Sequence, residues 1–163
     1  MDVRIASSGV SVIEVMREER FPAGVDEVWA IVSDAGRAAE WFDFSDRTEV
    51  RSGEGVGQLR TQHGHWGHRQ SEVDQEITEC VPGAVLAWKH VAERIDGRPA
   101  PKFAARTEFR IELTGDASST TVRLRSLQTP AGPLKGWLMR RMGTKDIARN
   151  MDRSLERLTG LLS

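Results

Sequence analysis

The last thirty residues of the chain constrain its fold more than any other segment. Apolar side chains recur there at intervals of mostly three or four residues: Leu134, Leu138, Ile147, Met151, Leu155, Leu158 and Leu162. This spacing predicts an amphipathic helix over residues 133–162, with a kink near Gly143. No other segment is long enough to cover a sheet, so the remaining elements must be arranged around this helix.

The middle of the chain is a series of predicted strands. From Ala105 to Leu113 apolar residues alternate with charged ones, so one face of a strand there is apolar and the other charged. Similar patterns, bounded by Gly and Pro turns, predict further strands over residues 11–21, 47–51, 56–63, 69–81, 85–91 and 121–128. Two short helices are expected over residues 25–34 and 36–42, and a loop over 96–101.

This order of elements predicts an α+β fold in which a curved antiparallel sheet of about six or seven strands wraps around the long C-terminal helix. The two short helices follow the first strand. A sheet that wraps around one helix encloses a space that side chains need not fill, so a ligand cavity is expected there. The length of 163 residues suits a single domain over residues 1–163.

Composition excludes several classes of function. The chain has 23 Lys and Arg against 24 Asp and Glu, and a net charge of −1 favours neither nucleic acid nor an acidic membrane as a partner. The single cysteine, Cys80, cannot form an internal disulfide, and the first thirty residues lack a signal-peptide profile, so we expect a cytoplasmic protein. No apolar run is long enough for a membrane span. The sequence leaves open whether the chain forms a homodimer.

Several short motifs resemble those of a known family in order and spacing. They are the run Phe21–Asp34 followed by Glu40–Trp41, Ile77 with Pro82 and Leu86–Trp88, Thr120–Val122, and Leu155–Leu158. Together they resemble the polyketide cyclase/dehydratase type of the SRPBCC superfamily, which includes the START and Bet v 1-like proteins. The resemblance covers nearly the whole chain and implies the helix-grip fold. It implies an activity less strongly, because members cyclise, hydrolyse, carry lipids or only bind.

Aromatic residues are the first candidates for ligand contact. Trp41, Trp88, Phe109 and Trp137 are expected on the cavity wall, with Met151 on the inner side of the C-terminal helix. Such side chains hold a large, flat, poorly polar ligand through buried area and ring stacking. The alternative is that they are ordinary core residues, because buried tryptophan is common in proteins without a ligand.

Histidines are the candidates for proton transfer. His90 follows Leu86 and Trp88 by alternation, which predicts that it faces the cavity, where a neutral imidazole could act as a general base. His63 is a second candidate. Together with His65 and His68 it has a spacing that admits zinc, but no carboxylate or cysteine motif accompanies it, so we expect no metal and no cofactor.

Polar residues at apolar strand positions are candidates for fixing the orientation of a ligand. Ser71, Gln75, Thr107 and Ser126 are expected to face the interior, where they bond to one another or to a ligand. Five arginines are expected on the opposite, solvated face: Arg60, Arg106, Arg110, Arg123 and Arg125. Aromatase/cyclase relatives are often described with a tyrosine and an arginine in the cavity. The chain has no tyrosine, which weakens the transfer of that mechanism.

Two classes of function follow from these residues. As an enzyme, the protein would fold a polyketone chain inside the cavity and use His90 or His63 as the proton acceptor. As a binding protein, it would carry, sense or sequester a polyketide- or lipid-like hydrophobic molecule in the same cavity. A co-chaperone-like interaction module is a further alternative, which an exposed apolar groove would favour over a closed pocket.

Overall fold

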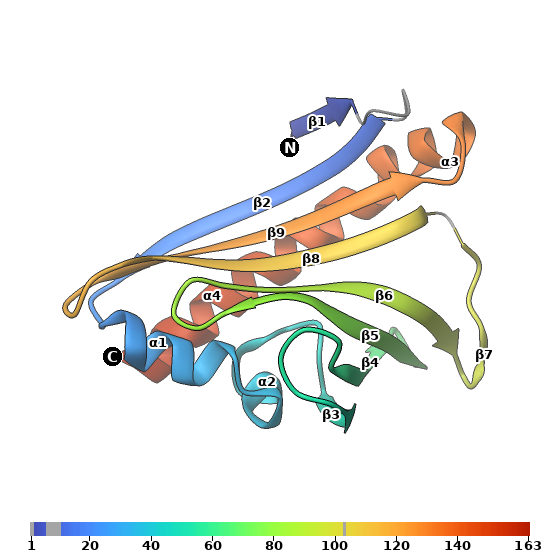
Figure 1. Cartoon of the computed structure of the whole chain (residues 1–163). Coiled ribbons are helices and arrows are strands. Elements are labelled where there is room, and N and C mark those ends of the chain that lie inside the picture. Colours follow the sequence, from blue (N-terminus) through green and yellow to red (C-terminus); the bar gives the residue numbers. More distant parts are fainter. Residues whose placement is uncertain (1, 6–10, 103) are drawn as a thin grey trace.

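The computed structural model describes residues 2–5, 11–102 and 104–163, with side chains from residue 11 onward. Within these residues nine strands form one antiparallel sheet in the order β1-β2-β9-β8-β6-β5-β4-β3, and β7 pairs with the end of β6. The long C-terminal helix lies across one face of this sheet (Figure 1). We call the face toward the helix the inner face and the opposite one the outer face.

The strands and helices follow the predicted order. The strands are β1 (Asp2–Ile5), β2 (Ser11–Phe21), β3 (Arg47–Ser52), β4 (Leu59–Trp66), β5 (Arg69–Val81), β6 (Val85–Ile95), β7 (Arg98–Pro99), β8 (Ala104–Gly115) and β9 (Thr120–Pro130). The helices are α1 (Val25–Val32), a 3₁₀ turn (Ala35–Arg37), α2 (Ala38–Trp41), α3 (Pro133–Leu138), a π-helical turn (Met139–Gly143) and α4 (Thr144–Leu162). The predicted α+β fold with a sheet around a C-terminal helix is confirmed.

The boundaries differ most from the prediction at β4, at β6 and in the segment 96–101. β6 continues to Ile95 instead of ending at residue 91. β4 begins at Leu59 instead of residue 56, because residues 53–58 turn the chain through left-handed glycines such as Gly55 and Gly57. The segment 96–101, predicted as a loop, contains the two-residue strand β7. β1 was not predicted from the sequence.

The core lies between the inner face and α4. Met151, Leu155 and Leu158 of α4 are buried with apolar residues of β2, β5, β6, β8 and β9 in one cluster. Cross-strand pairs such as Leu86 with Ile111 bring inward side chains together on neighbouring strands. Burial of these residues is the main contribution that holds the helix against the sheet.

Polar contacts fix the segment that follows α2 against α4. The hydroxyl of Ser154 is fully buried, accepts a hydrogen bond from the Asp43 backbone N–H at 2.9 Å and donates one to the Asn150 carbonyl at 2.7 Å. Arg153 and Arg157 form ion pairs with the Asp43 carboxylate. These contacts direct the residues next to Asp43 into the core.

The π-helical turn changes which residues of α3 face the sheet. Thr144, Met151 and Leu158 are buried at seven-residue spacing, and a regular α-helix continued backward would place Trp137 on the same side. The wider π turn shifts this pattern by one residue. Gly136 and Met139 are buried instead, and Trp137 faces outward. The predicted kink near Gly143 is thus a π turn.

Candidate functional site

A cluster of aromatic rings occupies the centre of the inner face. Trp88 of β6 stacks on Phe109 of β8 with ring centroids 5.1 Å apart, and the edge of Phe42 meets both rings. Phe44 packs against Phe42 and Phe109, and Trp41 packs behind Phe42. The predicted positions of Trp41, Trp88 and Phe109 on the inner side are therefore compatible both with core packing and with contact to a ligand.

Three buried nitrogens next to this cluster have no hydrogen-bond partner among the described residues. They are Nε1 of Trp41, Nε1 of Trp88 and Nδ1 of His90. Such groups are rare in folded proteins, because each one loses its bond to water on burial. The His90 nitrogen lies 3.4 Å from Oε1 of Glu93, close enough to interact electrostatically but outside good hydrogen-bond geometry.

A β-bulge brings Glu93 to the same face as His90. Asp74 pairs with Ala92 and Gln75 pairs with His90, so Val91 between them has no partner on β5. The extra residue reverses the alternation beyond it, and Glu93 faces inward although strict alternation from His90 would place it outward. The nearby imidazole holds the pKa of Glu93 below its usual range, partly opposed by desolvation. No local pattern in the sequence signals this bulge, so alternation alone does not predict that Glu93 lies beside His90.

Two glutamines and an arginine extend the polar part of the inner face. Gln75 is buried and donates a hydrogen bond from Nε2 to Oε1 of Gln62 at 3.1 Å. Arg60 lies opposite Gln75 on β4 and is partly buried, and desolvation lowers its pKa. The prediction that Arg60 lies on the solvated face is wrong, because β4 pairs with β5 in a register that places Arg60 on the side of Gln75.

Burial of the inward side chains decreases along the strands toward one end of the sheet. Leu86, Ile111 and Leu124 are almost fully buried, and Ser126 and Gln75 remain buried one or two positions further along. The next inward residues are only half-buried: Ser71, His90, Thr107 and Gln128. We call this region the open end of the inner face. It lies at the end of β9 that leads into α3 (Figure 1).

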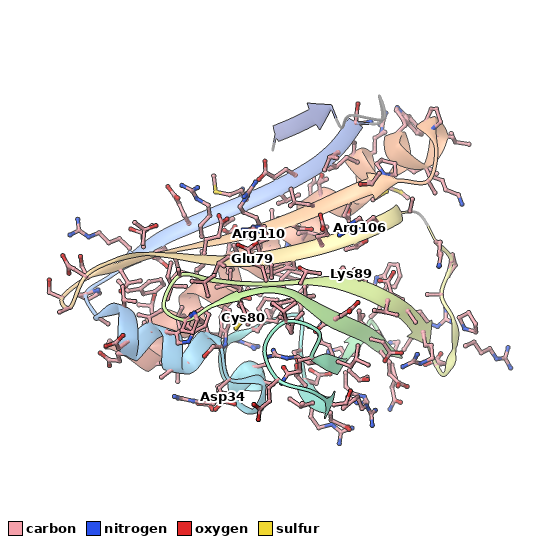
Figure 2. All side chains as sticks on the ribbon, in the orientation of Figure 1. Asp34, Glu79, Cys80, Lys89, Arg106 and Arg110 are labelled. Carbon is pink, nitrogen blue, oxygen red and sulfur yellow. The ribbon has the colours of Figure 1, made fainter. Side chains whose placement is uncertain are left out.

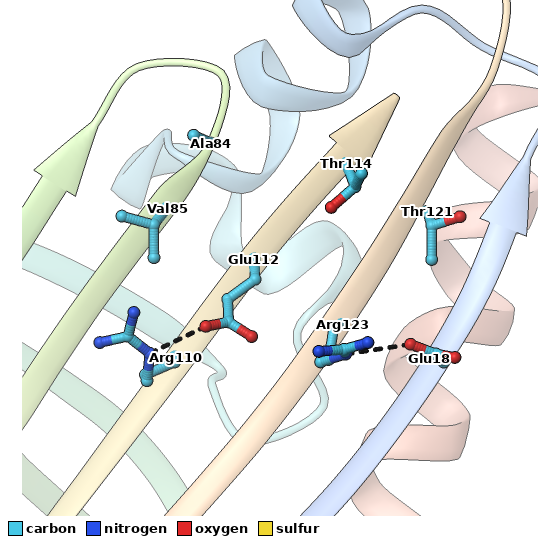
Figure 3. Close-up of a pocket in the computed structure, with 8 residues that line it drawn as sticks. All are labelled: Glu18, Ala84, Val85, Arg110, Glu112, Thr114, Thr121 and Arg123. Atoms are coloured by element: carbon cyan, nitrogen blue, oxygen red, sulfur yellow. Dashed lines mark hydrogen bonds and ion pairs between the residues drawn. The ribbon is translucent and has the colours of Figure 1, made fainter. Parts of the chain in front are cut away.

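The described hollows of the molecule lie elsewhere. One, of about 300 Å³, is on the outer face and is lined by Glu18, Ala84, Val85, Arg110, Glu112, Thr114, Thr121 and Arg123 (Figure 3). A second, of about 370 Å³, lies beside β4, β5 and β6, and its lining includes Arg60 and Gln75 as well as Asp74, Val91 and Arg94. Neither lies between the aromatic cluster and α4, so the enclosed cavity stays a prediction.

The outer-face hollow is lined by charges that already have partners. Arg110 forms ion pairs with Glu112 at 3.1 Å and, across the small residue Ala87 of β6, with Glu79 at 2.8 Å (Figure 2). Arg123 pairs with Glu18 at 3.0 Å. A ligand carboxylate or phosphate would have to displace these contacts, so the hollow is a poor anion site.

The remaining predicted site residues lie apart from the aromatic cluster. His63 is on the outer face, with Nε2 3.0 Å from Oε1 of Glu49, and this position does not support a cavity role. His65 contacts Asp46 at 2.6 Å. In residues 11–102 and 104–163 no group of three or more His, Cys, Asp or Glu side chains is arranged to hold a metal ion. Trp137 is 52% exposed, so its predicted place on an interior wall is wrong.

Comparison with known families identifies the chain. Residues 12–162 match the sequence profile of the family described as "Polyketide cyclase / dehydrase and lipid transport". The chain belongs to this family. A search of curated proteins found no match.

Solved structures of similar fold agree with the family assignment. The Zhui aromatase/cyclase from Streptomyces sp. R1128 has a TM-score of 0.72 at 18% identity, over 93% of each chain. A START superfamily protein from Mycobacterium smegmatis has a TM-score of 0.70 at 12% identity, covering 91% of this chain and 96% of that one. The allergen Ara h 8.0201 has a TM-score of 0.70 at 12% identity, covering 93% and 97%.

These similarities show the fold of this chain and do not identify its ligand. The long C-terminal helix, the antiparallel sheet and the two short helices after the first long strand match the Bet v 1-like helix-grip fold. No helix in the described part of the chain has the length and apolar character that crossing a bilayer requires.

Proposed function

We propose that this protein binds a hydrophobic small molecule, polyketide- or lipid-like, at the open end of the inner face, next to the aromatic cluster. The observation that most supports this is the buried Nε1 of Trp88, which has no hydrogen-bond partner among the described residues and lies on the same face of β6 as His90. A buried polar group without a partner costs about 1–3 kcal/mol, and a ligand oxygen that accepts from the indole N–H would remove that cost.

Each predicted ligand-binding residue except Trp137, which lies on the surface, has a role in this proposal. The stacked rings of Trp88 and Phe109 provide flat apolar area, and Met151 of α4 lies on the opposite side of the core. Thr107 and Ser71 are half-buried at the open end of the inner face, which would be the entrance for a ligand, and their hydroxyls would face its polar end.

Ser126, Gln75 and Trp41 are more deeply buried than the residues at the open end. Ser126 and Gln75 are buried beneath the entrance, and Gln75 is already bonded to Gln62. Trp41 is almost fully buried behind Phe42 and positions that ring. Mass spectrometry of protein purified from its own host under native conditions would name the ligand class directly if a ligand is retained.

A matched pair of variants tests where the ligand binds. Thr107 and Thr114 lie on the same strand, β8, with Thr107 on the inner face and Thr114 in the outer-face hollow. We expect Thr107→Phe to weaken binding of an apolar fluorescent probe such as anilinonaphthalene sulfonate at least about tenfold by filling the entrance, a loss of about 1.4 kcal/mol. Thr114→Phe should leave the affinity unchanged. Equal affinities of the two variants, or no binding by the parent, would contradict the proposal.

Catalysis is the second candidate, and the contact between His90 and Glu93 favours it. A carboxylate near the imidazole stabilises the protonated form, as a general base requires after it accepts a proton. In an aldol cyclisation His90 would take a proton from a carbon between two carbonyls of a polyketone. The resulting enolate carbon would attack a third carbonyl, whose oxygen would take up a proton as the alcohol.

The variant His90→Phe separates catalysis from binding. If the protein is a cyclase, turnover of a polyketone should fall by about 10²–10⁴ while ligand affinity stays within about tenfold. If the protein only binds, affinity alone should change. Turnover equal to that of the parent, with an unchanged melting temperature, would remove His90 from any mechanism and leave the binding proposal standing.

A further inference from the structure

The helical segment Pro133–Lys145, which precedes and begins α4, exposes large apolar side chains on one side. Leu134 is 69% exposed, Trp137 52% and Met142 65%. Leu134 and Trp137 are three residues apart, and Trp137 and Met142 are five residues apart with the π turn between Trp137 and the end of the segment. This spacing places all three on the same side of the helix, together with the half-buried Leu138. Clustered exposed apolar side chains of this size mark a surface that contacts something other than water. We call this side the α3 face.

The α3 face is held in its orientation by packing on its opposite side. Gly136 is buried, and a Cβ at this position would lie 3.0 Å from the ring of Pro130, so the glycine lets α3 approach the end of β9 closely without crowding that ring. The Nζ of Lys135 donates a hydrogen bond to the Lys102 carbonyl at 2.9 Å. Together with the π turn, these contacts keep Trp137 turned toward solvent.

The charged residues of the segment Pro133–Lys145 are all basic. Lys135, Arg140, Arg141 and Lys145 lie in this segment, and no acidic residue occurs between Asp116 and Asp146 in the sequence. None of the four pairs with a carboxylate of residues 11–102 or 104–163. Further along the same helix the pattern differs, since Arg149 and Arg153 each form an ion pair with an aspartate.

A cation–π contact joins the apolar and charged parts of the α3 face. The guanidinium carbon of Arg141 lies 5.1 Å from the centre of the Trp137 ring. An exposed tryptophan next to unpaired arginine and lysine side chains suits the boundary between lipid headgroups and acyl chains, where the ring lies at headgroup level and the cations bind phosphate.

We propose that the α3 face docks on the surface of a lipid bilayer that contains anionic lipids. Exposed apolar side chains would enter the headgroup region, and Arg140, Arg141 and Lys145 would attract anionic headgroups. A second copy of the chain is a poor occupant, because a symmetric contact would bring the cations of one copy against those of the other. The proposal goes beyond ligand binding, since it uses residues outside the inner face. The open end of the inner face lies at the end of β9 from which α3 begins, so docking would place that end near the membrane (Figure 1).

Vesicle co-sedimentation tests the proposal with the full chain. The parent should bind phosphatidylcholine vesicles that contain phosphatidylglycerol, bind pure phosphatidylcholine much more weakly, and lose binding as salt is raised. Each of Arg140→Gln and Arg141→Gln should lower the affinity for the anionic vesicles about fivefold, since each cation contributes on the order of 1 kcal/mol near such a surface. Trp137→Ser should lower it at least as much.

The matched control is Trp66→Ser. Trp66 is 70% exposed at the end of β4, more than Trp137, but lies in a different part of the molecule, so this variant should bind like the parent. Melting temperatures of all variants should be close to that of the parent, because Trp66, Trp137 and Arg141 are exposed and the half-buried Arg140 forms no ion pair among the described residues. Three results would overturn the proposal: no binding by the parent, equal loss with Trp66→Ser, or a dimer in sedimentation that Trp137→Ser dissociates. Binding to single-stranded DNA that Trp137→Ser abolishes, without vesicle binding, would assign the face to nucleic acid instead.

Discussion

Met151 provides the most direct test of the contact between the C-terminal helix and the sheet. Its side chain is fully buried in the cluster that joins α4 to the inner face. Replacement of a buried methionine by a small residue costs about 2–5 kcal/mol through lost burial and the space left behind. Met151→Asp adds a carboxyl group to the same apolar site, and the charged form of that group is not tolerated there without a partner.

The carboxyl group makes the destabilisation depend on pH in an unusual direction. Desolvation would raise the pKa of the new aspartate well above the ordinary value of about 3.9, so the folded state holds a proton that the unfolded state releases. Keeping that proton at about pH 7 costs up to about 4 kcal/mol, at 1.36 kcal/mol per pH unit. The sum with lost burial is about 6–9 kcal/mol, comparable to the whole stability of a typical domain.

Urea unfolding of Met151→Asp and Met151→Asn at several pH values tests this reasoning. The free energy of unfolding of the Asp variant, relative to the Asn variant, should rise as pH falls from about 7 toward 4, because the folded state binds more protons than the unfolded state in that range. Thr159→Asp, at an exposed position of the same helix, should show a small and pH-independent loss. A Met151→Asp protein as stable as the parent at neutral pH would show that α4 does not pack against the sheet as described.

Two other predictions follow from single contacts. The Arg94 guanidinium, with help from the Thr61 hydroxyl, holds the pKa of Asp74 below its usual range, so the stability that this pair contributes is present at neutral pH and is lost as pH falls below about 4. In chemical unfolding, Asp74→Asn should therefore be less stable than the parent at pH 7 but equal to it at strongly acidic pH. A difference in stability that does not change with pH would refute this. Gly24→Ala should destabilise the protein by about 1–3 kcal/mol, because the new Cβ would lie 2.5 Å from the Ala117 carbonyl oxygen. Gly160→Ala, in open space on α4, should stabilise it by about 0.5–1 kcal/mol. Melting curves that rank the two variants in the opposite order would contradict the described geometry.

Alternation of side chains predicted much of the inner face correctly. Ile111, Phe109 and Thr107 alternate inward along β8 as expected, because a strand without a bulge repeats every two residues. The same rule placed Trp88 and His90 on the inner face of β6. It failed immediately beyond His90, where the bulge at Val91 reverses the pattern.

The net charge describes the whole chain and does not reveal how charges are distributed over its surface. A value of −1 gave no indication of a basic surface, yet the charged residues of the segment Pro133–Lys145 are all basic: Lys135, Arg140, Arg141 and Lys145. On the outer face, in contrast, charges of opposite sign lie side by side, such as Glu112 with Arg110.

The sequence by itself determined the order of most elements and the fold, because periodicity of two or 3.6 residues depends only on which side chains must leave water. The family followed from the resemblance of its short motifs in order and spacing. Tertiary structure alone decided the positions where that periodicity is interrupted. The π turn before Thr144 moves Trp137 from the interior to the surface, and the bulge at Val91 moves Glu93 inward beside His90. Both interruptions add one residue to a regular element, and their location depends on packing and pairing with distant segments, which no local pattern records.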